Sequence, residues 1–153
     1  MRVILASKSP ARLHVLRHAG LEPEVIVSGY DESQIVDPVT TSLAARLAEA
    51  KGATVVPQLE GDFVLFACDS VLEFEGRAHG KPCSEAAAIE RWQRMRGHEG
   101  LLHTGHYVSV HQGERYSEQT RVGSTVVRFA DLSDDEIRAY AATGEPQKVA
   151  GGF

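Results

Sequence analysis

The sequence has few cysteines and no excess of positive charge. Cys68 and Cys83 are its only cysteines, and since they lack the paired spacing of a zinc site we expect two reduced thiols. Lys and Arg number 16 against 21 for Asp and Glu, a formal net charge of -5. This charge argues against nucleic acid as the main partner. It does not argue against a small anionic ligand, because a local pocket can be basic on an acidic protein.

Long apolar runs are missing as well. No stretch approaches the roughly 20 apolar residues that a membrane-spanning helix needs, and the apolar start of the chain is too short for a signal peptide. We therefore expect a cytoplasmic protein with no membrane partner. The 153 residues, 42% of them hydrophobic, can bury about two-thirds of their unfolded surface. No linker or repeat interrupts them, so we expect one domain over residues 1–153.

The order of the predicted elements favours an α/β fold with a mixed sheet. We expect Gln112 and Gly113 to form the turn of a hairpin. Ser84 is the expected N-cap of one helix, and Ser133 with Glu136 forms a capping box at the start of another. Strands are predicted over 2–6, 24–28, 62–74, 101–111 and 115–129, and helices over 10–19, 40–54 (with Leu43, Leu47 and Ala50 on one side), from about 84, and from about 134.

Residues 5–12, LASKSPAR, join the first predicted strand to the first helix. Ser9 is expected to cap the helix, with Pro10 at its first position. A helix N-terminus attracts phosphate, Ser7 and Ser9 would add hydroxyl donors, and Arg12 can make forked contacts with phosphate. From these residues alone, a plain capped helix with a surface arginine is the favoured interpretation, and an anion site is the alternative.

Asp69 lies inside the most apolar stretch of the chain, residues 62–74. An unpaired carboxylate would be costly there. Two interpretations are equally good: an isolated structural ion pair, or a functional carboxylate that faces a cleft.

The other charged candidates are weak when taken singly. Glu32 follows Asp31 in a turn, where a solvated acidic turn is the simple interpretation. Lys51 and Lys81 are single lysines, which are usually solvated. Taken together with the segment 5–12, however, these residues would suit phosphate chemistry, since carboxylates can hold Mg²⁺ and cations neutralise phosphate charge.

Two further patterns are not expected to be sites. His14 and His18 have a helical spacing that can bind a metal, but exposed or hydrogen-bonded helix histidines are the favoured interpretation. Cys68 is expected to be a buried strand residue rather than a nucleophile, because no histidine base can be assigned to it from the sequence.

The combination of segments resembles the Maf family over essentially the whole chain. Each motif is weak alone, but seven in the same order are specific. The family is named for a septum-formation phenotype, and its members are nucleoside triphosphate pyrophosphatases. The matching segments are LASKSPARLHVL, GYDES, LAEAK, CDSVL, GKP, MRGHEGLLHTG, and the stretch from TVVRFADLSDDEIRAYAATGEP to AGGF.

The resemblance implies an α/β fold like that of inosine triphosphatases, with a cleft between two lobes and often a homodimer. It implies hydrolysis of nucleoside triphosphates, with non-standard or modified ones as candidates, to the monophosphate and pyrophosphate. A divalent cation, Mg²⁺ or Mn²⁺, would be the cofactor. The alternative is a non-catalytic nucleotide-binding regulator of cell division.

The resemblance also implies residue roles. Asp69 matches the family's proton acceptor, and Glu32 matches the acidic residue that would hold the metal together with Asp69. Phosphate binding would fall to Ser7, Ser9, Arg12, Lys51 and Lys81.

The chain departs from the family pattern at several places, one of which is Lys148-Val149, where the family has Asp-Lys. Pyrimidine-preferring members carry two arginines after the proline, and the first is Ala11 here. They carry threonine after the catalytic aspartate, where this chain has Ser70. The resemblance therefore leaves the base preference open. The family also continues past the equivalent of Phe153, so we expect this chain to lack the family's C-terminal portion.

Overall fold

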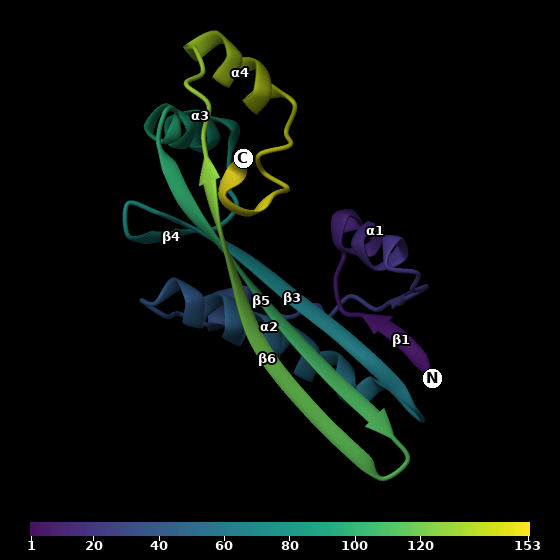
Figure 1. The fold of residues 1–153 in the computed structure, drawn as a ribbon. Coiled ribbons are helices and arrows are strands. Elements are labelled where there is room, and N and C mark those ends of the chain that lie inside the picture. The colour runs from purple at the N-terminus through teal and green to yellow at the C-terminus, as the bar shows by residue number, and fades with distance from the viewer. The chain divides into compact units, whose positions relative to one another are not determined.

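A computed structural model describes residues 1–153, and it confirms the predicted α/β class with a mixed sheet (Figure 1). No helix is both long enough and apolar enough to cross a membrane. The helices are α1 (Pro10–His18), α2 (Thr40–Val55), α3 (Glu85–Met95) and α4 (Asp134–Ala142). The strands are β1 (Arg2–Leu5), β2 (Glu24–Val25), β3 (Phe63–Phe74), β4 (Arg77–His79), β5 (Glu99–Gln112) and β6 (Arg115–Arg128).

The sheet has the order β2-β1-β3-β5-β6, with β4 paired to β3. Strand β1 runs parallel to both β2 and β3, whereas β4 is antiparallel to β3. The long apolar strand predicted around Asp69 is thus an inner strand of the sheet, as its apolar composition indicates.

The chain forms two compact units. Unit 1 comprises Met1–Asp37, Ser42–Asp69 and Thr104–Gly123, and unit 2 comprises Pro38–Thr41, Ser70–His103 and Ser124–Phe153. Strands β3, β5 and β6 therefore contribute residues to both units, and each unit has a hydrophobic core of its own.

The core of unit 1 lies between the sheet and α2. Alternate residues of β3, namely Phe63, Leu65 and Ala67, are fully buried and pack with Ala48 and Val55 of α2. This alternation is what a half-covered strand requires, because successive side chains point to opposite faces. The next residue in the same row of β3 is Asp69, so the row of core residues leads directly to it.

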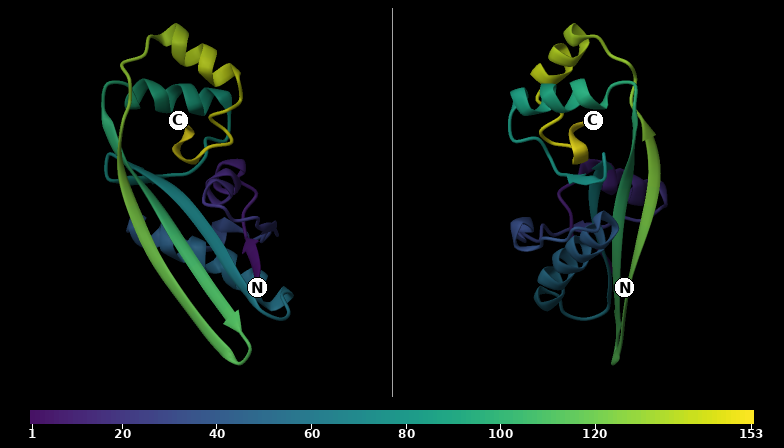
Figure 2. Two further views of the ribbon diagram at one scale, coloured as in Figure 1. Left: turned by 45° about the vertical axis from the view of Figure 1, so that its right-hand side comes forward. Right: turned by 90° about the vertical axis from the view of Figure 1, so that its left-hand side faces the viewer.

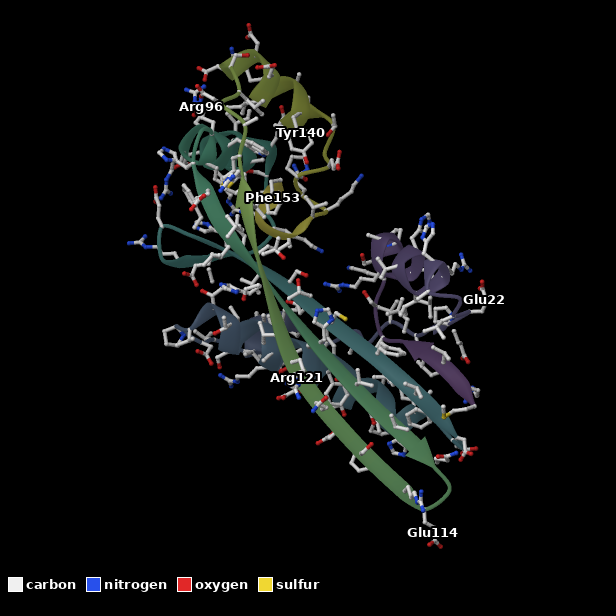
Figure 3. The ribbon with its side chains drawn as sticks, in the orientation of Figure 1. Glu22, Arg96, Glu114, Arg121, Tyr140 and Phe153 are labelled. Carbon is white, nitrogen blue, oxygen red and sulfur yellow. The ribbon has the colours of Figure 1, made fainter.

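In unit 2, α3 and α4 pack against each other and against the ends of the long strands (Figure 2). Trp92 and Met95 are buried on α3, as predicted, and Ile137 is buried on α4. The Trp92 ring meets Phe129 edge-on, with ring centroids 5.9 Å apart. Phe153, which is labelled in Figure 3, makes a similar contact with Phe129, with ring centroids 5.4 Å apart.

Both predicted caps in unit 2 are confirmed. The Ser84 hydroxyl accepts from Ala87 N–H at 3.1 Å. Ser133 and Glu136 form the reciprocal capping box. Each cap satisfies amide groups that the helix itself leaves without a partner.

Three local predictions were wrong in detail. The hairpin turn consists of Gly113, with φ +58°, and Glu114, one residue later than predicted (Figure 3). Strand β2 is much shorter than 24–28. The buried side of α2 carries Ala44, Leu47 and Ala48 rather than Leu43 and Ala50. The helix is rotated in this way because Ala44 packs against the backbone at a glycine of β5.

Candidate functional site

The loop after β1 is organised by the hydroxyl of Ser7. This side chain is largely buried, and its Oγ accepts from Ser9 N–H at 3.2 Å and from Arg12 Nη1 at 3.2 Å. A serine hydroxyl has two acceptor lone pairs and one hydrogen to donate. With both of those contacts made, the hydroxyl hydrogen of Ser7 is the group that remains for a ligand oxygen.

Ser9 stands at the N-cap position of α1 with Pro10 at the first helical position, but its side chain makes no capping hydrogen bond. The predicted side-chain cap is therefore wrong. The loop is organised by Ser7 instead, whose Oγ accepts from Ser9 N–H. The Ser9 hydroxyl, not being used within the helix, can serve a ligand at the helix N-terminus, where the dipole favours negative charge.

Hydrogen bonds fix the side chain of Arg12 beside this loop. Its Nη1 also donates to the carbonyl oxygen of Cys68 at 2.8 Å, which ties the first turn of α1 to β3. Because Cys68 directly precedes Asp69, the guanidinium is anchored beside the strand residue that carries the predicted catalytic carboxylate.

Asp69, Lys51 and Glu32 form one cluster. Lys51 Nζ forms a very short ion pair with Asp69 Oδ1 and lies 2.8 Å from Glu32 Oε1. The side chains of Lys51 and Asp69 are only 13% and 11% exposed, whereas that of Glu32 is 57% exposed. Two carboxylates thus share one ammonium group, and one of the two is buried.

The environment of Asp69 shifts its acidity. Burial raises the pKa of the Asp69 carboxyl above its ordinary value of 3.8, the positive charge of Lys51 opposes this rise, and the negative charge of Glu32 adds to it. A carboxylate whose pKa is raised in this way binds a proton more readily than one on the surface. Asp69 is therefore in an ion pair, as one of the two interpretations from the sequence has it, and Glu32 adds a second carboxylate to that pair.

The position of Lys51 depends on two glycines that the sequence analysis did not single out. A Cβ on Gly105 of β5 would lie 2.1 Å from the Ala44 carbonyl oxygen, and a Cβ on Gly52 of α2 would lie 2.2 Å from the Tyr107 ring. Helix α2 therefore lies close to β5: the α2 backbone packs on Gly105, and the Tyr107 ring of β5 packs on Gly52. The signal was a glycine inside each periodic pattern, which indicates close backbone approach.

The structure gives Cys68 a neighbour that the sequence did not. His106 Nδ1 lies 3.5 Å from Cys68 Sγ, although the two residues are 38 positions apart. Burial raises the pKa of the Cys68 thiol, so the thiol is kept protonated and unreactive. Both cysteines are free, as predicted.

The side chains that commonly ligate metals do not cluster in this structure. Nowhere in residues 1–153 do three or more His, Cys, Asp or Glu side chains form a group that could hold a metal ion. His14 and His18 are exposed, and His18 Nδ1 lies 2.9 Å from the carbonyl oxygen of His14. The interpretation as ordinary helix histidines is confirmed.

The remaining predicted site residues lie elsewhere. Ala11 is exposed in the first turn of α1. Ser70 and Lys81 belong to unit 2. Lys81 is exposed and follows Gly80 in the loop between β4 and α3. Of the predicted phosphate-binding and acidic residues, unit 1 therefore contains Ser7, Ser9, Arg12, Glu32, Lys51 and Asp69.

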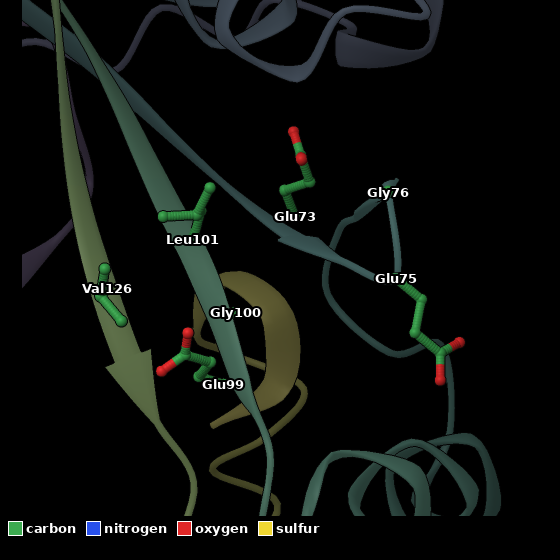
Figure 4. A pocket seen from close by; sticks show the side chains of 7 residues that line it. All are labelled: Glu73, Glu75, Gly76, Glu99, Gly100, Leu101 and Val126. Atoms are coloured by element: carbon green, nitrogen blue, oxygen red, sulfur yellow. The ribbon is translucent and has the colours of Figure 1, made fainter.

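Unit 2 has a hollow of about 280 Å³ that contains none of these residues (Figure 4). Its lining includes three glutamates, Glu73, Glu75 and Glu99, together with Leu101 and Val126. Each glutamate has a basic neighbour: His103 for Glu73, Arg94 for Glu75 and Arg128 for Glu99. Because the hollow contains none of the predicted site residues, the cluster in unit 1 is the candidate site.

Fold and site together define an α/β protein with a phosphate-compatible loop beside a buried carboxylate–lysine pair. Comparison with known proteins makes this specific. Residues 2–153 match the family of Maf-like proteins, and the chain belongs to this family.

Similar proteins carry one recurring name. A nucleoside triphosphate pyrophosphatase of Streptomyces avermitilis is 51% identical over 99% of this chain and 73% of its own length. One of Cutibacterium acnes is 49% identical over 98% of this chain and 73% of its own length. Among solved structures, the Ham1 protein of Staphylococcus aureus is similar at a TM-score of 0.49 and 15% identity, over 86% of this chain and 73% of that one. That structural likeness is too weak to support a statement about function.

Proposed function

We propose that this chain hydrolyses nucleoside triphosphates, non-standard or modified ones included, to the monophosphate and pyrophosphate. The observation that carries the proposal is the cluster of Asp69, Lys51 and Glu32 in unit 1. Relatives about half identical over nearly the whole chain are named for this activity. We propose further that residues 1–153 act as one Maf-like domain in the cytoplasm.

The donor set in unit 1 fits a divalent cation. Asp69 and Glu32 both pair with Lys51 Nζ, so their oxygens already flank one positive charge, which a divalent cation would replace. Mg²⁺ is commonly held by one or two carboxylates, with substrate phosphates and water completing its shell. Asp69 and Glu32 are the residues that would hold Mg²⁺ or Mn²⁺. When bound, such an ion supplies Lewis-acid stabilisation of charge on the phosphates.

Asp69 would act as the proton acceptor. A water oxygen attacks the α-phosphorus, the bond from that phosphorus to the bridging oxygen breaks, and pyrophosphate leaves with the bond electrons. The proton of the water passes to Asp69, whose raised pKa suits it to accept one. A positioned base of this kind accelerates hydrolysis by about 10² to 10⁴-fold.

The cations and hydroxyls would hold the triphosphate. Arg12 is already fixed through Cys68, so it can meet phosphate oxygens without losing further side-chain freedom. Lys51 would offset charge that develops on the leaving pyrophosphate. We assign the same role to Lys81. The hydroxyls of Ser7 and Ser9 would donate hydrogen bonds to phosphate oxygens.

Ala11 and Ser70 would bear on the choice of base. Ala11 is exposed beside the phosphate loop and carries no charge, so a cation that pyrimidine-preferring relatives offer there is missing. We therefore propose a broader base selection than theirs. The homodimer that the family resemblance implies stays a prediction, which the molecular mass in solution tests.

The decisive experiment offers a panel of standard and modified nucleoside triphosphates with Mg²⁺ and identifies the products. The wild-type protein should release pyrophosphate and monophosphate, and Asp69→Asn should lose about 10² to 10⁴-fold in turnover. Asp135→Asn is the matched control, because that carboxylate lies on α4 with a side chain 93% exposed. Orthophosphate and diphosphate as products would contradict the proposal. Tight nucleotide binding without turnover would favour the regulator instead.

A further inference from the structure

Arg91 connects two loops of unit 2. Its Nη1 donates to the carbonyl oxygen of Gly80 at 2.5 Å and to that of Gly151 at 2.9 Å. Gly80 immediately precedes Lys81 in the loop between β4 and α3. One guanidinium nitrogen on a helix therefore fixes the backbone next to the exposed lysine.

The second loop, which contains Gly151 and Gly152, also contacts the loop that carries Lys81. The indole Nε1 of Trp92 donates to the carbonyl oxygen of Gly152 at 2.8 Å. Gly152 has a φ of +86°, and a Cβ placed on it would lie 3.0 Å from the ring of Pro82. This backbone therefore packs directly against Pro82, the residue that follows Lys81.

The neighbours of Lys81 on both sides, Gly80 and Pro82, are thus fixed by contacts. Gly80 is hydrogen-bonded to Arg91, and Pro82 is packed against Gly152. Both supports originate from adjacent residues of α3, because Arg91 and Trp92 hold Gly151 and Gly152 in turn. Restricting a loop before binding lowers the entropy that the ligand must otherwise remove.

We propose that Arg91 is a positioning residue, which holds the Gly80–Pro82 loop so that Lys81 is presented to the phosphates of the substrate. This inference rests on the proposed function, because it assumes that Lys81 binds substrate. It goes beyond that function by assigning a residue that itself contacts no substrate.

The contacts of Arg91 separate this role from simple support of the core. The core contacts of α3 are made by Trp92 and Met95, which are buried with Phe129 and Ile137, while Arg91 is only partly buried and bonds to loop carbonyls. Arg94, one turn along the same helix, pairs with Glu75, which lies outside both loops. Arg94→Met is therefore a matched control that removes a guanidinium from α3 and leaves the Lys81 loop untouched.

The test is a double-mutant cycle on pyrophosphate release. We expect Arg91→Met to lower kcat/KM by about tenfold, the size of a lost charge-assisted contact, and Arg94→Met to change it by less than about twofold. Lys81→Ala should cost at least as much as Arg91→Met. If Arg91 acts through Lys81, adding Arg91→Met to Lys81→Ala costs nothing further. Additive losses, or an unaffected Arg91→Met, overturn the inference.

Folding is checked in the same proteins. Trp92 is the single tryptophan of the chain, so its fluorescence reports on the backbone at Gly152 to which it is bonded. Arg91→Lys retains one positive donor and should recover part of the lost kcat/KM. If Arg91→Met does not fold, this conservative variant decides: non-additivity with Lys81→Ala supports the inference, and additivity overturns it.

Different results would contradict the proposed pyrophosphatase activity and the proposed positioning role of Arg91. If the wild-type protein releases no pyrophosphate, the proposed function is wrong, and the same cycle is measured as the Kd for a triphosphate whose α,β-bridging oxygen is replaced by methylene. If wild type is active and Lys81→Ala changes neither kcat/KM nor Kd, the function stands and the positioning role of Arg91 is overturned.

Discussion

Strand β3 carries carboxylates in both units, and their surroundings differ. In unit 1, Asp69 is buried and shares Lys51 with Glu32. In unit 2, Glu73 lines an open hollow, and Glu75 just beyond the strand pairs with Arg94 on the surface. Surface pairs of the latter kind contribute little to stability. Burial, rather than the presence of charge, distinguishes the carboxylate suited to chemistry.

The strongest test of this contrast removes, one at a time, the cation that pairs with each carboxylate. Lys51→Met should lower kcat/KM by about 10² to 10³-fold, because under the proposed function this charge stabilises the leaving pyrophosphate in a site with little water. Arg94→Met, which removes the cation beside Glu75, should change it by less than about twofold. Steady-state pyrophosphate release measures both. A loss of similar size in the two variants would abolish the distinction between the units.

A second test concerns the backbone contacts behind each carboxylate. Gly105→Ala should lower the free energy of unfolding by about 1 to 3 kcal/mol, because the new Cβ would lie 2.1 Å from a carbonyl oxygen of α2. Gly100→Ala in unit 2 should cost less, since the nearest backbone atom lies 2.9 Å away. Urea unfolding compares the two, and an equal or larger loss for Gly100→Ala would contradict the importance of the α2 contact.

The helix starts of the two units give a third comparison. Ser133→Ala should lower the free energy of unfolding by about 1 kcal/mol, because the capping box of α4 is complete. Ser9→Ala should leave stability nearly unchanged, because the Ser9 side chain makes no cap bond. Thermal unfolding measures both variants. A marked loss for Ser9→Ala would show that its hydroxyl does cap α1 in solution.

The contributions of Asp69 in unit 1 and Glu136 in unit 2 to the free energy of unfolding should change with pH in opposite directions. Because burial raises the pKa of Asp69 above 3.8, its contribution to stability is present at low pH and is lost as the pH rises through that raised pKa. Hydrogen bonds from Ser133 lower the pKa of Glu136 below 4.5, so its contribution is present above 4.5 and is lost as the pH falls through the lowered pKa.

The measurement is the difference in unfolding free energy between wild type and Asp69→Asn, followed with pH. This difference should turn against the wild type as pH rises, whereas the difference for Glu136→Gln should turn in its favour. Slopes of the same sign would show that the positive charge of Lys51, rather than burial, decides the direction of the pKa shift of Asp69.

Local chemistry made much of unit 2 predictable. Ser84 and Ser133 begin helices because a hydroxyl can reach an amide a few residues along the chain, and both caps form. Ser9 has the same type of sequence signal but does not cap. Around Ser9 the loop is shaped by tertiary contacts instead, because Ser7 Oγ accepts from Arg12 and Arg12 donates to the Cys68 carbonyl of β3.

The amino-acid sequence by itself determined the α/β class, most strand and helix positions, and the family resemblance that pointed to Asp69, Lys51 and Glu32, because periodicity and capping act over a few residues. Only the tertiary structure decided that Asp69 and Glu32 share one lysine, that His106 lies beside Cys68, and that Arg91 holds the loop of Lys81. These contacts join segments far apart in the chain. Their distances follow from how helices pack on strands, where glycines such as Gly105 permit close approach.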